Sequence, residues 1–401
     1  MKRLNEVFKN LTYEANCDIE KVEIDGIEFN LKQELENKLV VVFENSLEKY
    51  KMTISDIELK KPSAIISSDK IESSIPHIKV ENLRKCFSKM CSNFYGNPEE
   101  NLKIIFVTGT NGKTSTTKII SEILNVGKIK TGTIGTLGSD FGQVHWNSEL
   151  TTPDPNVLFK VMSEMLKLGC ECVVMEASSH ALYLEKLSSL YAEVGVLTNC
   201  SRDHLDFFKT IERYQDAKYK MFDQNMIKWA VVNGDDILGK RIIENNPLPI
   251  VRYGKNEAYE ISFSNLTYNN KTEFDVTFGG ETHHVTTDLI GEFNVYNILA
   301  GIATARLLNV SEENIFTAVK NMKVVGGRFE KIPNNFGLNI VIDFAHTPDS
   351  VENVIKAAKN IDKKAKIITV IGCGGDRDRG KRAIMGQIAT EQSDYVVVTT
   401  D

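Results

Sequence analysis

The segment that decides the fold reads Val107-Thr108-Gly109-Thr110-Asn111-Gly112-Lys113-Thr114-Ser115. It follows the apolar run Ile104–Val107 and precedes a stretch with isoleucine and leucine at helical spacing. Glycines in such a loop let backbone N–H groups approach phosphate oxygens, and the N-terminus of the next helix adds a favourable dipole. Lys113 would reach the β- and γ-phosphates, and the Thr114 hydroxyl would bind Mg²⁺. The segment predicts a phosphate-binding loop.

The loop departs from the strict Walker A pattern at one position. That pattern has glycine five residues before Gly112, where this sequence has Val107, so the match is to a shortened variant. The alternative interpretation is a glycine-rich turn that only caps a helix. Gly-Lys-Thr placed after a strand and before a helix favours the phosphate loop.

Apolar runs and helical stripes alternate from about residue 98 onward. This alternation predicts an α/β fold with a mostly parallel sheet covered by helices, and residues 255–290 are predicted to form shorter β segments. The remaining predicted elements are strands at Cys172–Met175, Val194–Leu197 and Ala230–Val232, and helices over 157–166 and at Asn294–Leu308.

Two breaks in these patterns divide the chain into three predicted domains. Gly96-Asn97-Pro98 follow a predicted amphipathic helix, Val80–Phe94, and a third α/β region begins near Gly326. The predicted domains are 1–97, 98–325 and 326–401. In the last of them the predicted elements are strands at Leu338–Ile342, Ile367–Ile371 and Tyr395–Thr400 and a helix at Val351–Asn360.

Composition narrows the class of protein. A net charge of −6 over 401 residues gives no broad basic surface for nucleic acid. The polar N-terminus resembles no signal peptide, and no apolar run is long enough to predict a membrane span. The seven cysteines include no Cys-x-x-Cys pair, which favours reduced thiols in the cytoplasm over disulfides or a zinc site.

Eight further motifs accompany the phosphate loop in a fixed order. They are Thr151–Asp154, Glu176–His180, Asn199 with Asp203–Asp206, Tyr214–Lys218, Gly291–Asn297, Gly327–Glu330, Asp343–Asp349 and Gly372–Arg377. With this order and the loop form GTNGKTS, which folylpolyglutamate synthetases share, residues 80–401 resemble the Mur ligase family. The segments DFAHTPDS and GCGGDRDRGKR are most similar to the branch that adds the third residue of the peptidoglycan stem peptide.

The resemblance implies a three-domain Mur ligase architecture. It would have an N-terminal domain for the UDP-linked substrate, a central P-loop ATPase domain with a parallel sheet, and a C-terminal Rossmann-like α/β domain that binds the amino acid. The family's reaction activates a carboxylate as an acyl phosphate, which an amino-acid amine then attacks, so that ADP and phosphate leave. Because the reactants are anionic, such a site needs positioning and concentrated positive charge.

The resemblance also implies a metal site and a modified lysine. Thr114, Glu176 and His204 match the family's Mg²⁺ ligands, and Lys113 its catalytic lysine. Lys218 matches a lysine that CO₂ carbamylates, which converts a cation into an anion able to bind or orient Mg²⁺. That chemistry requires a neutral amine and hence a lowered pKa.

Further site residues follow from the same resemblance. Asn294 and Asn297 share a helix face and would lie near the adenine, while Arg328 would contact the ATP phosphates and Asp343 the ribose. The predicted ATP-binding residues are Gly109, Thr110, Asn111, Gly112, Lys113, Thr114, Ser115, Asn294, Asn297, Arg328 and Asp343; the predicted substrate-binding residues are Thr151, Thr152, Ser178, Lys186 and Arg377.

The sequence departs from the family pattern in three places. Residues 1–79 lack the expected uridine-binding signature, and Ile24–Glu28 stands roughly where it would lie. Lys186 stands where the family has arginine. The chain ends at Asp401, the first residue of an expected Asp-Asn-Pro-Arg motif, so we expect a C-terminal domain that is incomplete relative to the family and a chain that is a fragment of a longer ligase.

Three hypotheses follow. The first is a cytoplasmic, monomeric, ATP- and Mg²⁺-dependent ligase that adds meso-diaminopimelate or L-lysine to UDP-N-acetylmuramoyl-L-alanyl-D-glutamate. The second is a ligase of the same fold that acts on another glutamyl acceptor, such as a folate or a polymer. The third is a truncated nucleotide-binding protein without turnover.

Overall fold

The computed structural model describes residues 1–268, 271–374 and 378–400. The chain forms two compact units, which are described separately: unit 1 comprises Met1–Leu102, Thr152–Cys170 and His180–Leu190, and unit 2 comprises Lys103–Thr151, Glu171–Ser179 and Tyr191–Asp401. In the described ranges, no helix is both long and apolar enough to cross a bilayer.

Unit 1 contains a five-stranded sheet in the order β2-β7-β6-β5-β4. Strands β4 to β7 are parallel, and β2 is antiparallel to β7. The buried strand residues Val40, Val42 and Ile65 pack with Leu31, Leu35 and Ile57 as the core. The elements are β1 (Lys2–Arg3), α1 (Leu4–Val7), β2 (Glu14–Ala15), β3 (Glu23–Ile24), β4 (Gly26–Glu28), β5 (Lys38–Val42), α2 (Ser46–Tyr50), α3 (Ile54–Glu58), β6 (Ala64–Ser67), β7 (His77–Lys79), α4 (Leu83–Phe94), the 3₁₀ turn η1 (Pro98–Glu100) and α6 (Pro155–Lys167).

The predicted helix Val80–Phe94 begins later than expected. Helix α4 starts at Leu83 because the Asn82 side chain accepts the N–H of Lys85 at 3.0 Å and caps the helix there. Val80 instead donates its N–H to the carbonyl of Ser67 at 3.1 Å, which extends the strand pairing just past β7. The apolar side chain of Val80 is therefore part of the strand end and not of the helix.

Unit 2 is built on an eleven-stranded sheet in the order β11-β10-β9-β12-β8-β13-β14-β15-β16-β17-β18. The pairings from β9 to β16 are parallel, and hairpins extend both edges. The strands are β8 (Lys103–Thr108), β9 (Thr131–Gly135), β10 (Gly138–Phe141), β11 (Val144–Trp146), β12 (Cys172–Glu176), β13 (Ala192–Leu197), β14 (Ile227–Asn233), β15 (Ile250–Gly254), β16 (Ile261–Tyr268), β17 (Thr272–Phe278) and β18 (Glu281–Thr287). The predicted parallel sheet is confirmed, as are the β segments over 255–290.

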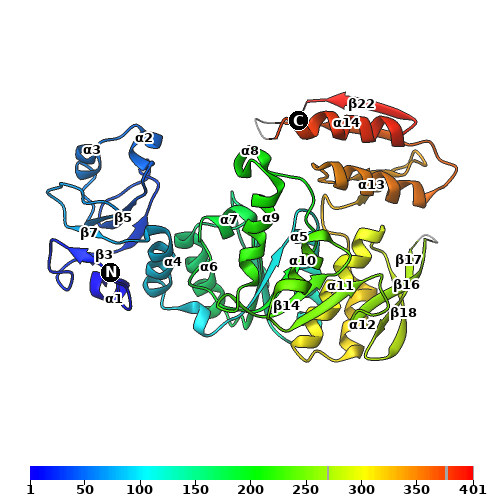
Figure 1. The fold of residues 1–401 in the computed structure, drawn as a ribbon, viewed down its shortest axis with the longest axis horizontal. Helices are drawn as coiled ribbons and strands as arrows, with labels where there is room; N and C mark the ends of the chain where they lie inside the picture. The colour runs from blue at the N-terminus through cyan, green and yellow to red at the C-terminus, as the bar shows by residue number, and fades with distance from the viewer. Residues whose placement is uncertain (269–270, 375–377, 401) are drawn as a thin grey trace. The chain divides into compact units, whose positions relative to one another are not determined.

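Helices α5 (Lys113–Val126), α11 (Glu292–Leu307) and α12 (Glu312–Asn321) belong to the main core of unit 2. Helix α11 is buried on nearly every side, because it packs on α5 and also against β14 and β15 (Figure 1). The predicted helix Asn294–Leu308 is confirmed as α11. The other elements of this part are α7 (Ser179–Tyr183), which crosses the unit boundary, α8 (Leu205–Phe208), α9 (Ile211–Tyr219), the 3₁₀ turn η2 (Lys220–Phe222) and α10 (Ile237–Asn245).

The C-terminal part of unit 2 has two small sheets. Strands β19 (Glu330–Ile332) and β20 (Ile340–Ile342) are antiparallel, whereas β21 (Ile368–Gly372) and β22 (Tyr395–Thr399) are parallel. Helices α13 (Pro348–Ile361) and α14 (Gly380–Gln392) pack side by side (Figure 1). Apolar strand residues such as Ile368, Val370 and Val398 stay exposed. The predicted strands and helix of this part are confirmed, with shifts of one to three residues at their ends.

The position of β8 in the middle of the sheet generates a stability prediction. Phe106 is fully buried on this strand, so Phe106→Ala is expected to lower the free energy of unfolding by about 3–5 kcal/mol through lost burial and a cavity. Urea denaturation followed by circular dichroism measures this. Phe336→Ala, at a residue that is 82% exposed, is the control and should change stability by about 0.5 kcal/mol or less. Equal losses in the two variants would contradict the prediction.

Candidate active site

The phosphate loop runs from the end of β8 to the start of α5. Gly112 has a φ of +83°, and a Cβ there would lie 2.6 Å from Asn297 Oδ1, so this position requires glycine. The Thr110 hydroxyl donates to the Ser201 carbonyl at 3.0 Å, and the Asn111 N–H donates to Asn199 Oδ1 at 2.9 Å. The segment that follows β13 therefore fixes the loop.

The side chain of Lys113 folds back onto the phosphate loop. Its Nζ donates to the carbonyl oxygens of Gly109 and Thr110 at 2.8 and 2.9 Å. Burial lowers the pKa of Lys113. Ser115, in the first turn of α5, lines a small cleft together with Asn294 and Arg328. One predicted loop residue and two further predicted ATP-binding residues therefore border the same cleft.

Glu176 ends strand β12 at the carboxyl edge of the sheet, beside the loop. It is 1% exposed, and Oε1 accepts hydrogen bonds from the Thr114 hydroxyl and the Thr136 N–H, both at 2.9 Å. The Thr136 hydroxyl donates to Oε2 at 3.1 Å. A side chain at Gly135 would collide with this carboxylate. A carboxylate in contact with a hydroxyl offers the hard oxygen donors that Mg²⁺ prefers, so these two residues fit the predicted metal.

Lys218 lies on α9 and is also 1% exposed. Its Nζ is 4.4 Å from the centroid of the Tyr214 ring, and the Tyr214 hydroxyl is 3.1 Å from Thr110 Oγ1. Burial, aided by the charge of Lys113, lowers the pKa of Lys218 to about 7. A neutral amine is therefore accessible near pH 7, as the predicted chemistry of this residue requires.

His204 follows β13 in the left-handed backbone region, with φ of +55°, and caps α8. Its Nε2 lies 3.3 Å from Asp203 Oδ2. Asp203 Oδ1 accepts a hydrogen bond from Lys381 Nζ at 2.9 Å, and His346 Nε2 lies 3.6 Å from Oδ2. Burial opposes ionisation, but His346, His204 and Lys381 hold the pKa of Asp203 well below its usual range. Residues 178 positions apart in sequence thus meet beside a predicted metal ligand.

Arg328 connects the C-terminal part of unit 2 to the loop. Its Nη2 donates to Thr114 Oγ1 at 3.1 Å, and its guanidinium lies 4.7 Å from the centroid of the Phe344 ring. Asp343 Oδ2 accepts the Phe329 N–H at 2.7 Å and so fixes the turn that carries Arg328. The structure therefore places Arg328 at the loop. Asp343 has a role in that turn which the sequence did not predict.

The two predicted adenine residues lie together on α11. Asn297 Nδ2 donates to Asn294 Oδ1 at 3.2 Å, and Asn297 Oδ1 accepts the Thr116 hydroxyl at 3.1 Å. The predicted shared helix face is confirmed.

The predicted substrate residues are distributed over both units. In unit 2, Thr151 Oγ1 lies 3.1 Å from Thr136 Oγ1, and Ser178 follows β12 directly. Thr152, which is buried, and Lys186 belong to unit 1. Arg377 lies outside the described residues.

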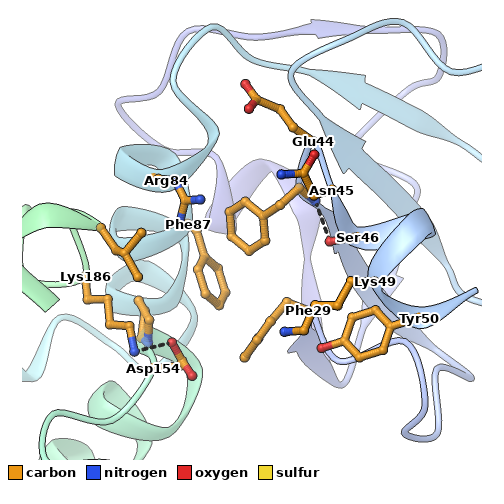
Figure 2. A pocket seen from close by; sticks show the side chains of 13 residues that line it. Phe29, Glu44, Asn45, Ser46, Lys49, Tyr50, Arg84, Phe87, Asp154 and Lys186 are labelled. Atoms are coloured by element: carbon orange, nitrogen blue, oxygen red, sulfur yellow. Dashed lines mark hydrogen bonds and ion pairs between the residues drawn. The ribbon is translucent and has the colours of Figure 1, made fainter. Parts of the chain in front are cut away.

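A pocket of about 310 Å³ opens within unit 1. Figure 2 shows Lys186 and Asp154 at one side of it, Lys49 and Tyr50 at the opposite side, and the rings of Phe29 and Phe87 between them. Its lining residues are Phe29, Phe43, Glu44, Asn45, Ser46, Lys49, Tyr50, Arg84, Phe87, Asp154, Pro155, Leu184 and Lys186. Apart from Lys186, sequence analysis missed this pocket. The one available signal was the cluster of aromatic and basic residues in α2 and α4 and the segments that lead into them.

Comparisons with known proteins identify the family of this chain. The pattern described as the Mur ligase middle domain matches residues 107–305, and that of the Mur ligase glutamate ligase domain matches residues 327–401. The chain is 36% identical over 405 residues to UDP-N-acetylmuramoyl-L-alanyl-D-glutamate–2,6-diaminopimelate ligase 1 of Clostridium acetobutylicum, covering 100% of this chain and 83% of that protein. The corresponding Bacillus cereus ligase is 38% identical, covering 84% of this chain and 70% of that protein.

A solved structure of a ligase with the same name superposes with a TM-score of 0.78 at 27% identity, covering 100% of this chain and 82% of that one. The chain therefore belongs to the Mur ligase family, whose members are ATP-dependent acid–amino-acid ligases. The predicted family, the predicted α/β fold with a mostly parallel sheet and the predicted enzyme class are confirmed.

Glu176→Gln tests the carboxyl edge of the sheet. The variant keeps the side-chain shape but removes the charge, so the affinity for Mg²⁺ with ATP is expected to fall by about 10- to 100-fold. Titration of a fluorescent ATP analogue against Mg²⁺ measures this. Glu193→Gln, at a residue of β13 paired with Lys228, is the matched control and should bind like the unaltered chain. An unchanged Mg²⁺ requirement in Glu176→Gln would contradict the assignment.

Proposed function

We propose that this chain catalyses the ATP-dependent addition of a diamino acid to UDP-N-acetylmuramoyl-L-alanyl-D-glutamate. The γ-phosphoryl group passes from ATP to the substrate carboxylate, and ADP leaves. The amine of the diamino acid then attacks the carbonyl carbon of the acyl phosphate, phosphate leaves, and the nitrogen loses a proton. The observation that carries the proposal is the meeting of the phosphate loop, Glu176 and Lys218 at one edge of the sheet, in a chain whose relatives bear the name of this reaction.

The residues beside the phosphate loop support the ATP half of the reaction. Lys113 and Arg328 bring two positive charges to the loop, and Arg328 reaches Thr114 from the C-terminal part of unit 2. Negative charge develops on the transferred phosphoryl oxygens, so fixed cations there stabilise the transition state. Asn294, which borders the same cleft as Ser115 and Arg328, would receive the nucleoside.

Mg²⁺ would be held by Thr114 and Glu176, with His204 and a carbamate on Lys218 as further ligands. When bound, the ion would neutralise the phosphate oxygens as charge develops. We propose that Lys218 is carbamylated: its neutral amine attacks CO₂, a C–N bond forms, one proton leaves, and an anionic carbamate results. The buried position and lowered pKa of Lys218 support this step.

The pocket in unit 1 supports a nucleotide-linked substrate. Aromatic rings stack on bases, and Phe29, Phe87 and Tyr50 line the pocket. Lys49 and Arg84 supply charge for a diphosphate, and Arg84 already lies over the Phe43 ring at 5.1 Å. We assign the uridine diphosphate to this pocket, and Thr151, Thr152 and Ser178 to the peptide-bearing part of the substrate.

The names of the relatives favour 2,6-diaminopimelate over L-lysine as the added amino acid, and we propose that it is the meso form. Arg377, in the Gly372–Arg377 motif, would bind it. We propose that the chain has three domains, divided after residues 97 and 325, and that it acts as a monomer in the cytoplasm.

Phosphate release from ATP tests the proposed reaction. Purified protein is assayed with Mg²⁺, bicarbonate, UDP-N-acetylmuramoyl-L-alanyl-D-glutamate and either meso-diaminopimelate or L-lysine. Release that requires both the nucleotide and diaminopimelate is expected, with the tripeptide product seen by mass spectrometry. Release that depends on a folate in place of the nucleotide would refute the proposed substrate, and ATP binding without any release would refute turnover.

Lys218→Ala tests the carbamate. The variant should lose turnover by a factor of about a thousand or more, since it removes a metal-binding group, while ATP binding stays within about threefold. In the unaltered chain, the pKa of about 7 means that the neutral amine predominates above pH 7 and is lost as the pH falls through that value. A carbamate signal in ¹³C NMR with labelled bicarbonate should therefore decline below pH 7. Lys220→Ala, two positions along, is the control. Full turnover in Lys218→Ala, or no carbamate signal, would contradict the assignment.

A further inference from the structure

Asp154 contributes a carboxylate to the pocket of unit 1, and this carboxylate does not cap the helix that Asp154 begins. It occupies the N-cap of α6, where an aspartate side chain ordinarily accepts an N–H of the first turn. Here the side chain makes no capping hydrogen bond. Instead its Oδ1 lies 2.7 Å from Lys186 Nζ, and both residues line the pocket (Figure 2). The carboxylate therefore serves Lys186.

The main chain of Lys186 is already fixed from two sides. Its N–H donates to the Ala181 carbonyl at 3.0 Å, and its carbonyl accepts the Ser88 hydroxyl at 3.1 Å. Ser88 lies on α4, four residues after Arg84, so the same helix supplies another wall of the pocket. A lysine side chain has a flexible four-carbon stem, so a fixed main chain does not fix its ammonium. The Asp154 carboxylate supplies that last restraint.

We propose that Asp154 is a positioning residue for the nucleotide substrate, because it holds the ammonium of Lys186 against the pocket so that this charge meets the diphosphate. The inference rests on the proposed function and adds a residue to it. An ammonium has three N–H donors. One is used on Asp154, and the other two remain to donate to phosphate oxygens.

The Asp154 carboxylate also repels a diphosphate, and the two effects must be compared. The pocket carries Lys49, Arg84 and Lys186 against Glu44 and Asp154, so its lining is net positive. Without Asp154 the ammonium of Lys186, whose side chain is 13% exposed, would turn toward water. Loss of a hydrogen bond from a charged donor typically outweighs a repulsion that solvent ions screen. The net effect of Asp154 is therefore tighter binding.

Asp154→Ala tests the inference in the full chain. KM for UDP-N-acetylmuramoyl-L-alanyl-D-glutamate should rise about tenfold or more, with kcat within about twofold, because one charged contact to the substrate is lost. Since Asp154 makes no cap, the fold should be retained. Asp154→Asn keeps an acceptor oxygen, so its KM should fall between those of the unaltered chain and Asp154→Ala. Asp18→Ala, which breaks an exposed ion pair with Lys21 in the same unit, is the control and should leave KM unchanged.

A double variant separates positioning from an independent effect. If Asp154 acts through Lys186, then combining Asp154→Ala with Lys186→Met should raise KM no further than Lys186→Met alone, because only the repulsion by Asp154 remains once the ammonium is removed. Three results would each overturn the inference. They are a double variant in which the KM increases of the two single variants multiply, a lower KM in Asp154→Ala, and a loss in kcat at constant KM. If the unaltered chain turns over the nucleotide and Asp154→Ala has the same KM, the inference about Asp154 is overturned but the proposed function is not. An unaltered chain that does not bind the nucleotide would overturn the proposed function as well.

Discussion

The buried carboxylate of Glu176 is the constraint on which the site in unit 2 depends. A charge that is 1% exposed is tolerated only when it is hydrogen-bonded and balanced. The hydroxyls of Thr114 and Thr136 donate hydrogen bonds to this carboxylate, and the positive charges of Lys113 and Arg328 help to balance its negative charge. Without the carboxylate, two cations would face each other at the loop with less to balance them. The strand end, the loop and the residue that reaches it from the C-terminal part thus form one electrostatic unit.

Much of this site could be predicted from the sequence because its chemistry is local. The loop and the helix that receives it lie within 20 residues, and their order alone predicts a phosphate site. Glu176 ends an apolar run, so its place at the carboxyl edge of a parallel sheet follows from the strand pattern. The spacing of Asn294 and Asn297 likewise fixes a shared face. The burial of Lys218 was different. Nothing in a polar helix indicated it, and only resemblance pointed to that residue.

What the sequence did not reveal depends on contacts between distant segments. Lys381 and Asp203 are 178 positions apart, and no spacing rule joins them. The pocket in unit 1 draws its lining from five stretches of chain, each of ordinary composition, so no single stretch marks it. Helix α4 also begins later than predicted, because the Asn82 cap fixes its first residue although the apolar pattern continues back toward the preceding strand. In each case tertiary structure decided what local patterns left open.

The lysine of the phosphate loop already has partners of its own, which affects how selective the loop is. Because Lys113 Nζ donates to two loop carbonyls at 2.8 and 2.9 Å, one of its three N–H groups remains for an incoming phosphate. A single charged hydrogen bond adds only a modest net free energy of binding. In the proposed site, inorganic phosphate would gain little beyond that one bond, whereas a polyphosphate that also contacts Arg328 and Thr114 would gain more. The loop would therefore favour ATP over free phosphate.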